Sequence, residues 1–269
     1  MKSFFTTIIV LLIAGAGAYY YLQLEKAEDQ VSRTEKTESL QVPEDTTPEI
    51  QHPIAEAPEI TGSSTEVEEP LPPLEESDNK VKEILSEIIG SDLIKKFFRE
   101  SAIIHRFVVT VDSLPTKEIP LKYRLLPPAS EKLLVQKDTS DKVTLDPENF
   151  KRYDAFIQLL GKIDTDQFVK WYTRFYPLIQ EDYDSLGYKN KYFNDRFIAV
   201  IDHLLETPEA TGPLVLVQPR VFYEFADPAL QNLSAGQKTL LRIGPANTAI
   251  VKARLIDIKK SLTASQPDN

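Results

Sequence analysis

The stretch DTDQFVKWYTRFYPLIQEDYDSL, residues 164–186, decides the fold of this chain. Its large apolar residues recur at spacings of four, three, four, four and three: Phe168, Tyr172, Phe175, Ile179, Tyr183 and Leu186. This spacing predicts a helix that begins at Asp164 and turns one face toward a core. Pro177 is expected to kink that helix, because its ring clashes with the carbonyl four residues back. An aromatic row also suits a ligand slot, but the helical spacing favours core packing.

Helical patterns continue on both sides of this stretch. Apolar residues at helical spacing, with capping residues before them and glycines after several of them, predict further helices. These lie at 77–89, 91–98, 103–111, 146–160, 190–206, 234–243 and 247–261. The last of them has Ile250, Val251, Leu255 and Ile258 as its apolar residues, and Gly161 is expected to stop the helix that starts at Asp146.

Two segments depart from the helical pattern. Residues 116–146 alternate partly and predict two or three short strands, with DTSD at 138–141 as a hairpin turn. Residues 214–225 read as extended, and Pro219 inside them implies an edge strand or a break. The predicted fold class is therefore mainly α: one helical domain with a small β-hairpin insertion.

An apolar run without formal charge occupies residues 4–22. It has the length of about 20 residues that a helix needs to cross a bilayer, and it predicts a single-pass membrane anchor. Ala16-Gly17-Ala18 would also suit signal-peptide cleavage, but the run is longer than such segments usually are. The basic residues at its two ends do not settle the orientation. A short N-terminal tail before a single span favours a cytoplasmic N terminus.

The segment 23–73 is acidic and rich in proline, with thirteen Asp and Glu against three Lys and Arg. Its composition predicts a disordered tether, because it has too few large apolar residues to bury. Prolines recur every five residues within it: Pro43, Pro48, Pro53 and Pro58. A plain spacer is the simpler interpretation, and a docking site for a partner is the alternative.

These features predict the domain boundaries. The membrane anchor covers 1–22, the tether 23–73 and the helical globular domain 74–262, and a disordered tail covers 263–269.

Composition excludes several classes of site. The chain has no cysteine and three histidines, one of them in the tether, so neither a thiolate nor a histidine-rich metal site is expected. Outside the tether acids and bases nearly balance, and no basic field exists that would hold a nucleic-acid backbone. No metal, cofactor or nucleic-acid partner is predicted.

The densest polar set in the folded part supplies the candidate site residues. They are Asp195, Arg196, Asp202, His203, Arg220, Glu224, Asp227 and Lys238. As chemistry, His203 beside Asp202 would be a general base with an orienting carboxylate, and Arg196 or Arg220 would clamp an anion. As structure, the same charges would be ion pairs that hold a helix against residues 214–225. His105, at the edge of an apolar helix face, is expected to be structural.

Several separate motifs carry a resemblance to a known family. They are LPPLEESD (71–78), HRFVVTVDSLP (105–115), LDPENFKRYD (145–154), GYKNKYFNDRFIAVIDHLL (187–205) and VFYEFADPALQNLSAGQKTLLRIGP (221–245). In this order they resemble the family of unknown function DUF3014, over about 74–262. The resemblance implies a bacterial envelope protein with an N-terminal apolar segment, a variable tether and one helical domain. It implies no activity, cofactor or site residue.

Two functional hypotheses remain from the sequence. The first is a membrane-anchored binding or scaffolding protein of the bacterial cell envelope. Its N terminus would be cytoplasmic, its domain periplasmic, and its partner an envelope protein or a cell-wall component. The alternative is an envelope hydrolase-type enzyme that uses His203 and Asp202 with an arginine anion clamp. The sequence contains no GxSxG, P-loop or HExxH motif that would favour the enzyme.

Overall fold

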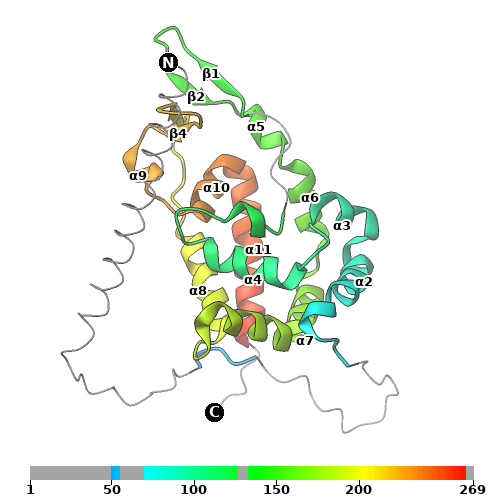
Figure 1. Ribbon diagram of the computed structural model, residues 1–269. Coiled ribbons are helices and arrows are strands. Elements are labelled where there is room, and N and C mark those ends of the chain that lie inside the picture. Colours follow the sequence, from blue (N-terminus) through cyan, green and yellow to red (C-terminus); the bar gives the residue numbers. More distant parts are fainter. Residues whose placement is uncertain (1–49, 55–69, 127–132, 265–269) are drawn as a thin grey trace, which may run out of the picture. The chain divides into compact units, whose positions relative to one another are not determined.

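The computed structural model describes residues 50–54, 70–126 and 133–264, which form a mainly helical domain with a small four-stranded antiparallel sheet (Figure 1). The helices are α2 (Asp78–Ile89), α3 (Ser91–Phe97), α4 (Ile103–Ser113), α5 (Glu148–Lys151), α6 (Asp154–Lys162), α7 (Thr165–Tyr183), α8 (Phe193–Leu205), α9 (Pro228–Gln231), α10 (Ala235–Ile243) and α11 (Pro245–Ala264). Short 3₁₀ turns cover Leu74–Glu76 (η1) and Leu121–Tyr123 (η2), and a π turn covers Asp184–Tyr188 (η3).

The predicted membrane anchor at 4–22 and most of the predicted tether lie outside the described residues. Within the part of the chain that the structure describes, no helix is both long enough and apolar enough to cross a bilayer.

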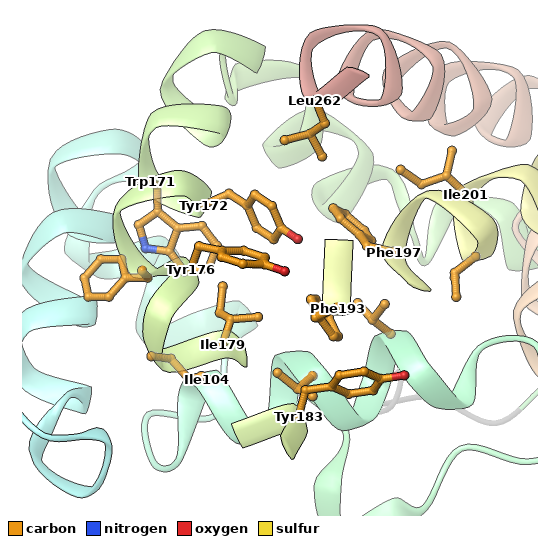
Figure 2. Packing of buried hydrophobic residues seen from close by; sticks show 14 of the residues in the cluster. Ile104, Trp171, Tyr172, Tyr176, Ile179, Tyr183, Phe193, Phe197, Ile201 and Leu262 are labelled. Carbon is orange, nitrogen blue, oxygen red and sulfur yellow. The ribbon is translucent and has the colours of Figure 1, made fainter. Parts of the chain in front are cut away.

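The helical core forms around α7, as the spacing of its apolar residues predicts. Tyr172, Phe175 and Ile179 are completely buried, and Figure 2 shows the ring of Tyr172 directed from α7 toward Phe197 of α8. The ring of Phe107 on α4 lies within 6.4 Å, centroid to centroid, of four aromatic rings: Trp171, Tyr172, Phe193 and Phe197. Edge-to-face and offset pairs of this kind stabilise a core beyond the area they bury. The aromatic row therefore packs a core.

The last of the described helices, α11, lies in the middle of this assembly. It packs against α6, α7, α8 and α10, and Figure 1 shows it in red behind α4. Leu262 near its end is buried in the same core cluster as the α7 aromatics. Helices separated in the sequence therefore meet on α11.

Local capping signals set several helix boundaries. The side chain of Asp164 accepts hydrogen bonds from the amides of Asp166 and Gln167 and starts α7, as predicted. Ser234 and Gln237 form a reciprocal capping box at the start of α10. Gly90 and Gly244, with φ near +90°, end α2 and α10 in a conformation that favours glycine. These predicted boundaries are confirmed.

The prediction of one helix from Asp146 to Leu160 is wrong, because the chain breaks it into α5 and α6. The buried side chain of Asn149 bonds both the amide and the carbonyl of Leu134, which ties α5 to the sheet. Leu159, by contrast, packs with α2 and α3. One straight helix could not place both Asn149 against Leu134 and Leu159 against α2 and α3. Gly161 does not stop α6, which ends after Lys162.

Two predicted core residues face solvent instead. The π turn η3 replaces the α-helix after Tyr183, with Gly187 at φ +100°, and leaves Leu186 38% exposed. Ile250 on α11 is 43% exposed, whereas Val251, Leu255 and Ile258 pack against the helical core.

The predicted hairpin is part of a larger sheet. Strands β1 (Val135–Lys137) and β2 (Val143–Leu145) form the hairpin, and β3 (Val215–Val217) and β4 (Glu224–Phe225) extend it. All neighbours are antiparallel in the order β1-β2-β3-β4, with Val143 opposite Leu216 and Leu216 opposite Phe225. The break expected at Pro219 is the loop between β3 and β4. Leu145, Leu216 and Phe225 pack with Leu241 of α10, which joins the sheet to the helices.

Candidate functional site

Residues 50–54, which the sequence assigns to the tether, lie against the start of α8 (Figure 1). The Asp195 carboxylate accepts hydrogen bonds from the amides of Gln51, at 3.1 Å, and His52, at 2.7 Å. Consecutive amides of a strand point to opposite sides, so one carboxylate takes both only because the chain bends at these two residues. The segment thus supplies two successive amides, and the domain supplies the carboxylate that accepts from both.

Two more side chains from the same turn hold the segment. Asn194 donates from Nδ2 to the carbonyl of His52 at 2.8 Å, and the Tyr192 hydroxyl accepts from the amide of Ile54 at 2.8 Å. Tyr192, Asn194 and Asp195 are called the clasp below. All four of these bonds go to main-chain atoms of residues 51–54. The clasp therefore recognises a polypeptide backbone.

Side chains from α7 fix the clasp in place. The first amides of a helix have no partner within the helix, and Tyr192 does not cap α8 with its side chain. Gln180 Oε1 instead accepts from the amide of Phe193 at 2.8 Å, and the Tyr176 hydroxyl accepts from that of Asn194 at 3.1 Å. Tyr176 in turn donates to Gln180 at 2.9 Å. The turn that carries the clasp is thus held by a helix of the core.

The side-chain amide of Asn194 is oriented by a residue of the core. Tyr172, one turn before Tyr176 on α7, donates its hydroxyl proton to Asn194 Oδ1 at 3.1 Å. This bond leaves Nδ2 directed at His52. Burial raises the pKa of Tyr172 and of Tyr176 well above its ordinary value of 10, so both hydroxyls stay protonated at neutral pH. Figure 2 shows both hydroxyls directed toward α8.

The side chains of the held segment make fewer contacts than its backbone. Ile54 is half-buried and packs against the helical core, whereas Pro53 is exposed. His52 is half-buried, and its Nδ1 is enclosed without a hydrogen-bond partner.

The structure places the predicted site residues of α8 on three separate neighbours. Asp195 belongs to the clasp. Arg196 Nε contacts Asp112 Oδ1 on α4 at 2.8 Å, and Asp202 contacts Lys259 Nζ on α11 at 2.5 Å. The expected ion pairs between this helix and residues 214–225 are therefore replaced by pairs to α4 and α11.

His203 has no acid–base partner among the described residues. Its carbonyl accepts from Gln237 at 3.1 Å, and its Nε2 is buried without a hydrogen bond. Neighbouring residues on a helix point in different directions, and the carboxylate of Asp202 is engaged by Lys259.

The remaining predicted residues gather around β4 and α9, away from the clasp. Arg220 is exposed in the β3–β4 loop, Glu224 lies on β4, and Asp227 caps α9 through the amide of Ala229 at 2.8 Å. Lys238 on α10 donates to the carbonyl of Gln231 at 3.4 Å. Burial lowers the pKa of Lys238, and the neighbouring positive charges add to that effect.

Sequence reasoning missed the polar partners of the clasp. It named Asp195 but neither Tyr192 nor Asn194, and it treated Tyr172 and Tyr176 only as apolar rings. A signal was present: Tyr172, Tyr176 and Gln180 follow one another at spacings of four, which places three polar ends on one helix face.

A second polar pair, His105 and Asp182, joins α4 to α7. His105 Nδ1 lies 3.0 Å from Asp182 Oδ1, and the Asp182 residue is only 4% exposed. Burial raises the pKa of the Asp182 carboxyl, and the hydrogen bond with His105 opposes the shift. The ring of Tyr123 meets His105 edge-on at 5.0 Å. The pair holds two core helices together at the edge of the domain.

Metal chemistry finds no support in the described residues, where no group of three or more His, Cys, Asp or Glu side chains is arranged to hold an ion. A hollow of about 950 Å³ lies between β2, the loop 208–214 and the start of α11. None of the predicted site residues lines it.

Comparison with known proteins gives one clear relationship. Residues 103–259, more than half of the 269-residue chain, match the family model described as protein of unknown function (DUF3014). The match runs from α4 into α11 and includes the clasp. Comparison with the curated proteins and with the solved structures gave no significant match. The chain belongs to the DUF3014 family, as the motifs in its sequence indicated.

Proposed function

We propose that this protein is a membrane-anchored binding or scaffolding protein of the bacterial cell envelope, and that its helical domain binds a short peptide segment of a partner. Residues 4–22 would hold it in the inner membrane with the N terminus in the cytoplasm. The domain would stand in the periplasm on the tether 23–73, within reach of envelope proteins and cell-wall components.

The observation that carries this proposal is the clasp. It binds polypeptide through three side chains and four main-chain hydrogen bonds, and side chains of α7 hold the turn that carries them and the amide of Asn194. A site prepared in this way loses little conformational entropy when it binds. The four hydrogen bonds all go to main-chain atoms, which supports a role in binding a peptide.

The hydrolase hypothesis gains no comparable support. It requires Asp202 to orient the ring of His203, whereas the Asp202 carboxylate contacts Lys259. His203 Nε2 is buried and has no hydrogen-bond partner. His203 therefore lacks the carboxylate partner that this hypothesis requires.

Peptide binding is tested on the full chain in detergent, with residues 50–54 replaced by Gly-Ser-Gly-Ser-Gly to vacate the clasp. A fluorescent peptide with the sequence of residues 47–56 should bind saturably by fluorescence anisotropy. In this vacated chain Asp195→Asn should weaken binding at least tenfold. The asparagine side chain is neutral, so it cannot accept hydrogen bonds from the two backbone N–H groups of the peptide as strongly as a charged carboxylate does.

Asp202→Asn is the matched control, because it changes the same chemical group seven residues further along α8. Binding should be unchanged in this variant. Absence of saturable binding in a chain with an unaltered circular dichroism spectrum, or equal loss in both variants, would refute the proposal. A C-terminal reporter that is active only outside the cytoplasm tests the orientation, and an inactive reporter on an intact chain would place the domain on the inner side.

A further inference from the structure

The sequence around the held proline differs from the other repeats of the tether. Of the prolines spaced five residues apart, Pro43, Pro48 and Pro58 are each followed by glutamate, whereas Pro53 is followed by Ile54. Ile54 packs against apolar side chains of the helical core. A glutamate in this place would bring a charge against an apolar surface without a partner. The clasp therefore holds the one repeat whose side chain suits the surface beneath it.

The proline itself fits the pattern of bonds. The clasp takes the amides of residues 51, 52 and 54 and leaves position 53 unused, so a residue without an N–H loses nothing there. Proline also restricts its own φ and the conformation of the residue before it, which reduces the entropy lost on binding. Two residues whose amides donate to Asp195, then a proline and an aliphatic residue, thus form one motif.

The held segment is an imperfect ligand. His52 places Nδ1 in an enclosed position without a hydrogen-bond partner, and desolvation of an unpaired polar atom weakens binding. A segment with an apolar residue at this position would bind the clasp more tightly. The chain's own segment is therefore one that a better ligand can displace.

We infer that residues 50–54 are an internal competitor that occupies the clasp, and that the partner segment carries two free amides, then proline, then an aliphatic residue. This inference rests on the proposed peptide-binding function. Fifteen residues, 55–69, join the internal segment to the domain, which keeps its effective concentration roughly millimolar. A partner segment must displace residues 50–54 from the clasp. Segments that bind weakly are therefore excluded, and segments that carry the motif can bind.

The experiment compares the intact chain with the vacated chain, using the labelled peptide of residues 47–56 and three altered peptides. The vacated chain should bind the unaltered peptide at least tenfold more tightly than the intact chain. In the peptide, Ile54→Glu should weaken binding at least tenfold, Pro53→Ala should weaken it severalfold, and His52→Leu should strengthen it severalfold.

The outcomes separate this inference from the function on which it rests. Equal affinity of the intact and vacated chains would overturn the internal competitor while leaving peptide binding in place. Unchanged affinity of the Ile54→Glu peptide would overturn the ligand motif in the same way. Failure of the vacated chain to bind any of these peptides would refute the proposed function itself.

Discussion

Tyr172 donates its hydroxyl proton to Asn194 across 3.1 Å, and neither side chain has any exposed surface. The two residues come from different core helices, and the bond turns the other end of the Asn194 amide outward to the carbonyl of His52. A contact inside the core thereby sets the direction of the donor that holds residues 50–54.

Tyr172→Phe should destabilise the domain by roughly 1–3 kcal/mol, because it leaves Asn194 Oδ1 buried without a donor. Tyr192→Phe is the control, since it removes an acceptor at the surface and should cost less than about 1 kcal/mol. Urea unfolding of the full chain in detergent measures both, with the single tryptophan, Trp171, as the fluorescent probe. Equal losses of unfolding free energy in the two variants would show that the buried hydrogen bond stabilises the domain no more than the surface one.

Gly236→Ala should destabilise the domain by roughly 1–3 kcal/mol, although alanine is the better helix former. An added Cβ would lie 2.6 Å from Leu204 Cδ2 and 3.0 Å from the carbonyl oxygen of Leu114, where α10 touches α8 and the end of α4. The matched control is Gly161→Ala in α6, where a Cβ meets nothing within 4 Å. That variant should gain up to about 1 kcal/mol. Thermal unfolding measures the stability of both variants. A gain in stability for both would contradict the close approach of Gly236 to Leu204 and Leu114.

The free energy of unfolding of Asp182→Asn, relative to that of the native protein, should increase as pH rises. Burial raises the pKa of Asp182 above its ordinary value of 3.8 in the folded state. A carboxyl of this kind favours folding most below that ordinary value, and its contribution is lost as pH rises through the folded-state pKa. The asparagine variant has no such loss.

Urea unfolding at pH 4 and pH 7 measures this difference. The free energy of unfolding of Asp182→Asn, relative to that of the native protein, should be higher at pH 7 than at pH 4. A change in the opposite direction would mean that pairing with His105 outweighs burial.

The Arg196–Asp112 pair should show real coupling between α8 and α4. Both side chains are partly shielded, and Arg196 also donates to the main-chain carbonyl of Asp112 at 2.9 Å. A double-mutant cycle with Arg196→Met and Asp112→Ala should give a coupling of about 1 kcal/mol. The exposed pair Lys151–Glu148 is the control, and its cycle should give no measurable coupling. Equal coupling energies from the two cycles would mean that the Arg196–Asp112 pair adds no more stability than an exposed surface pair.

Much of the helical architecture is predictable because its signals are local. The Asp164 and Ser234 caps and the glycines at positions 90 and 244 act within a few residues of themselves. The break between α5 and α6 is not predictable in this way, because it depends on Asn149 reaching Leu134 across the hairpin. The four-stranded sheet also depends on pairing between distant segments.

The candidate site was predictable only in part. Asp195 stands out as a charge on an amphipathic helix, but its partners are main-chain amides more than 140 residues earlier in the sequence. Every residue has a backbone, so contacts to it leave no mark in the composition of the segment that is held. The sequence favours a plain spacer over a docking segment for the tether, and the structure places residues 50–54 of the tether against the chain's own domain.

The central place of α11 has a consequence for how the protein is made. This helix follows α6, α7, α8 and α10 in the chain, yet all four pack against it. A growing polypeptide must therefore leave the apolar faces of these helices uncovered until α11 has been synthesised. Maturation depends on a late, cooperative closure, and substitution of Leu262 would prolong the interval in which nascent molecules aggregate or meet chaperones and proteases.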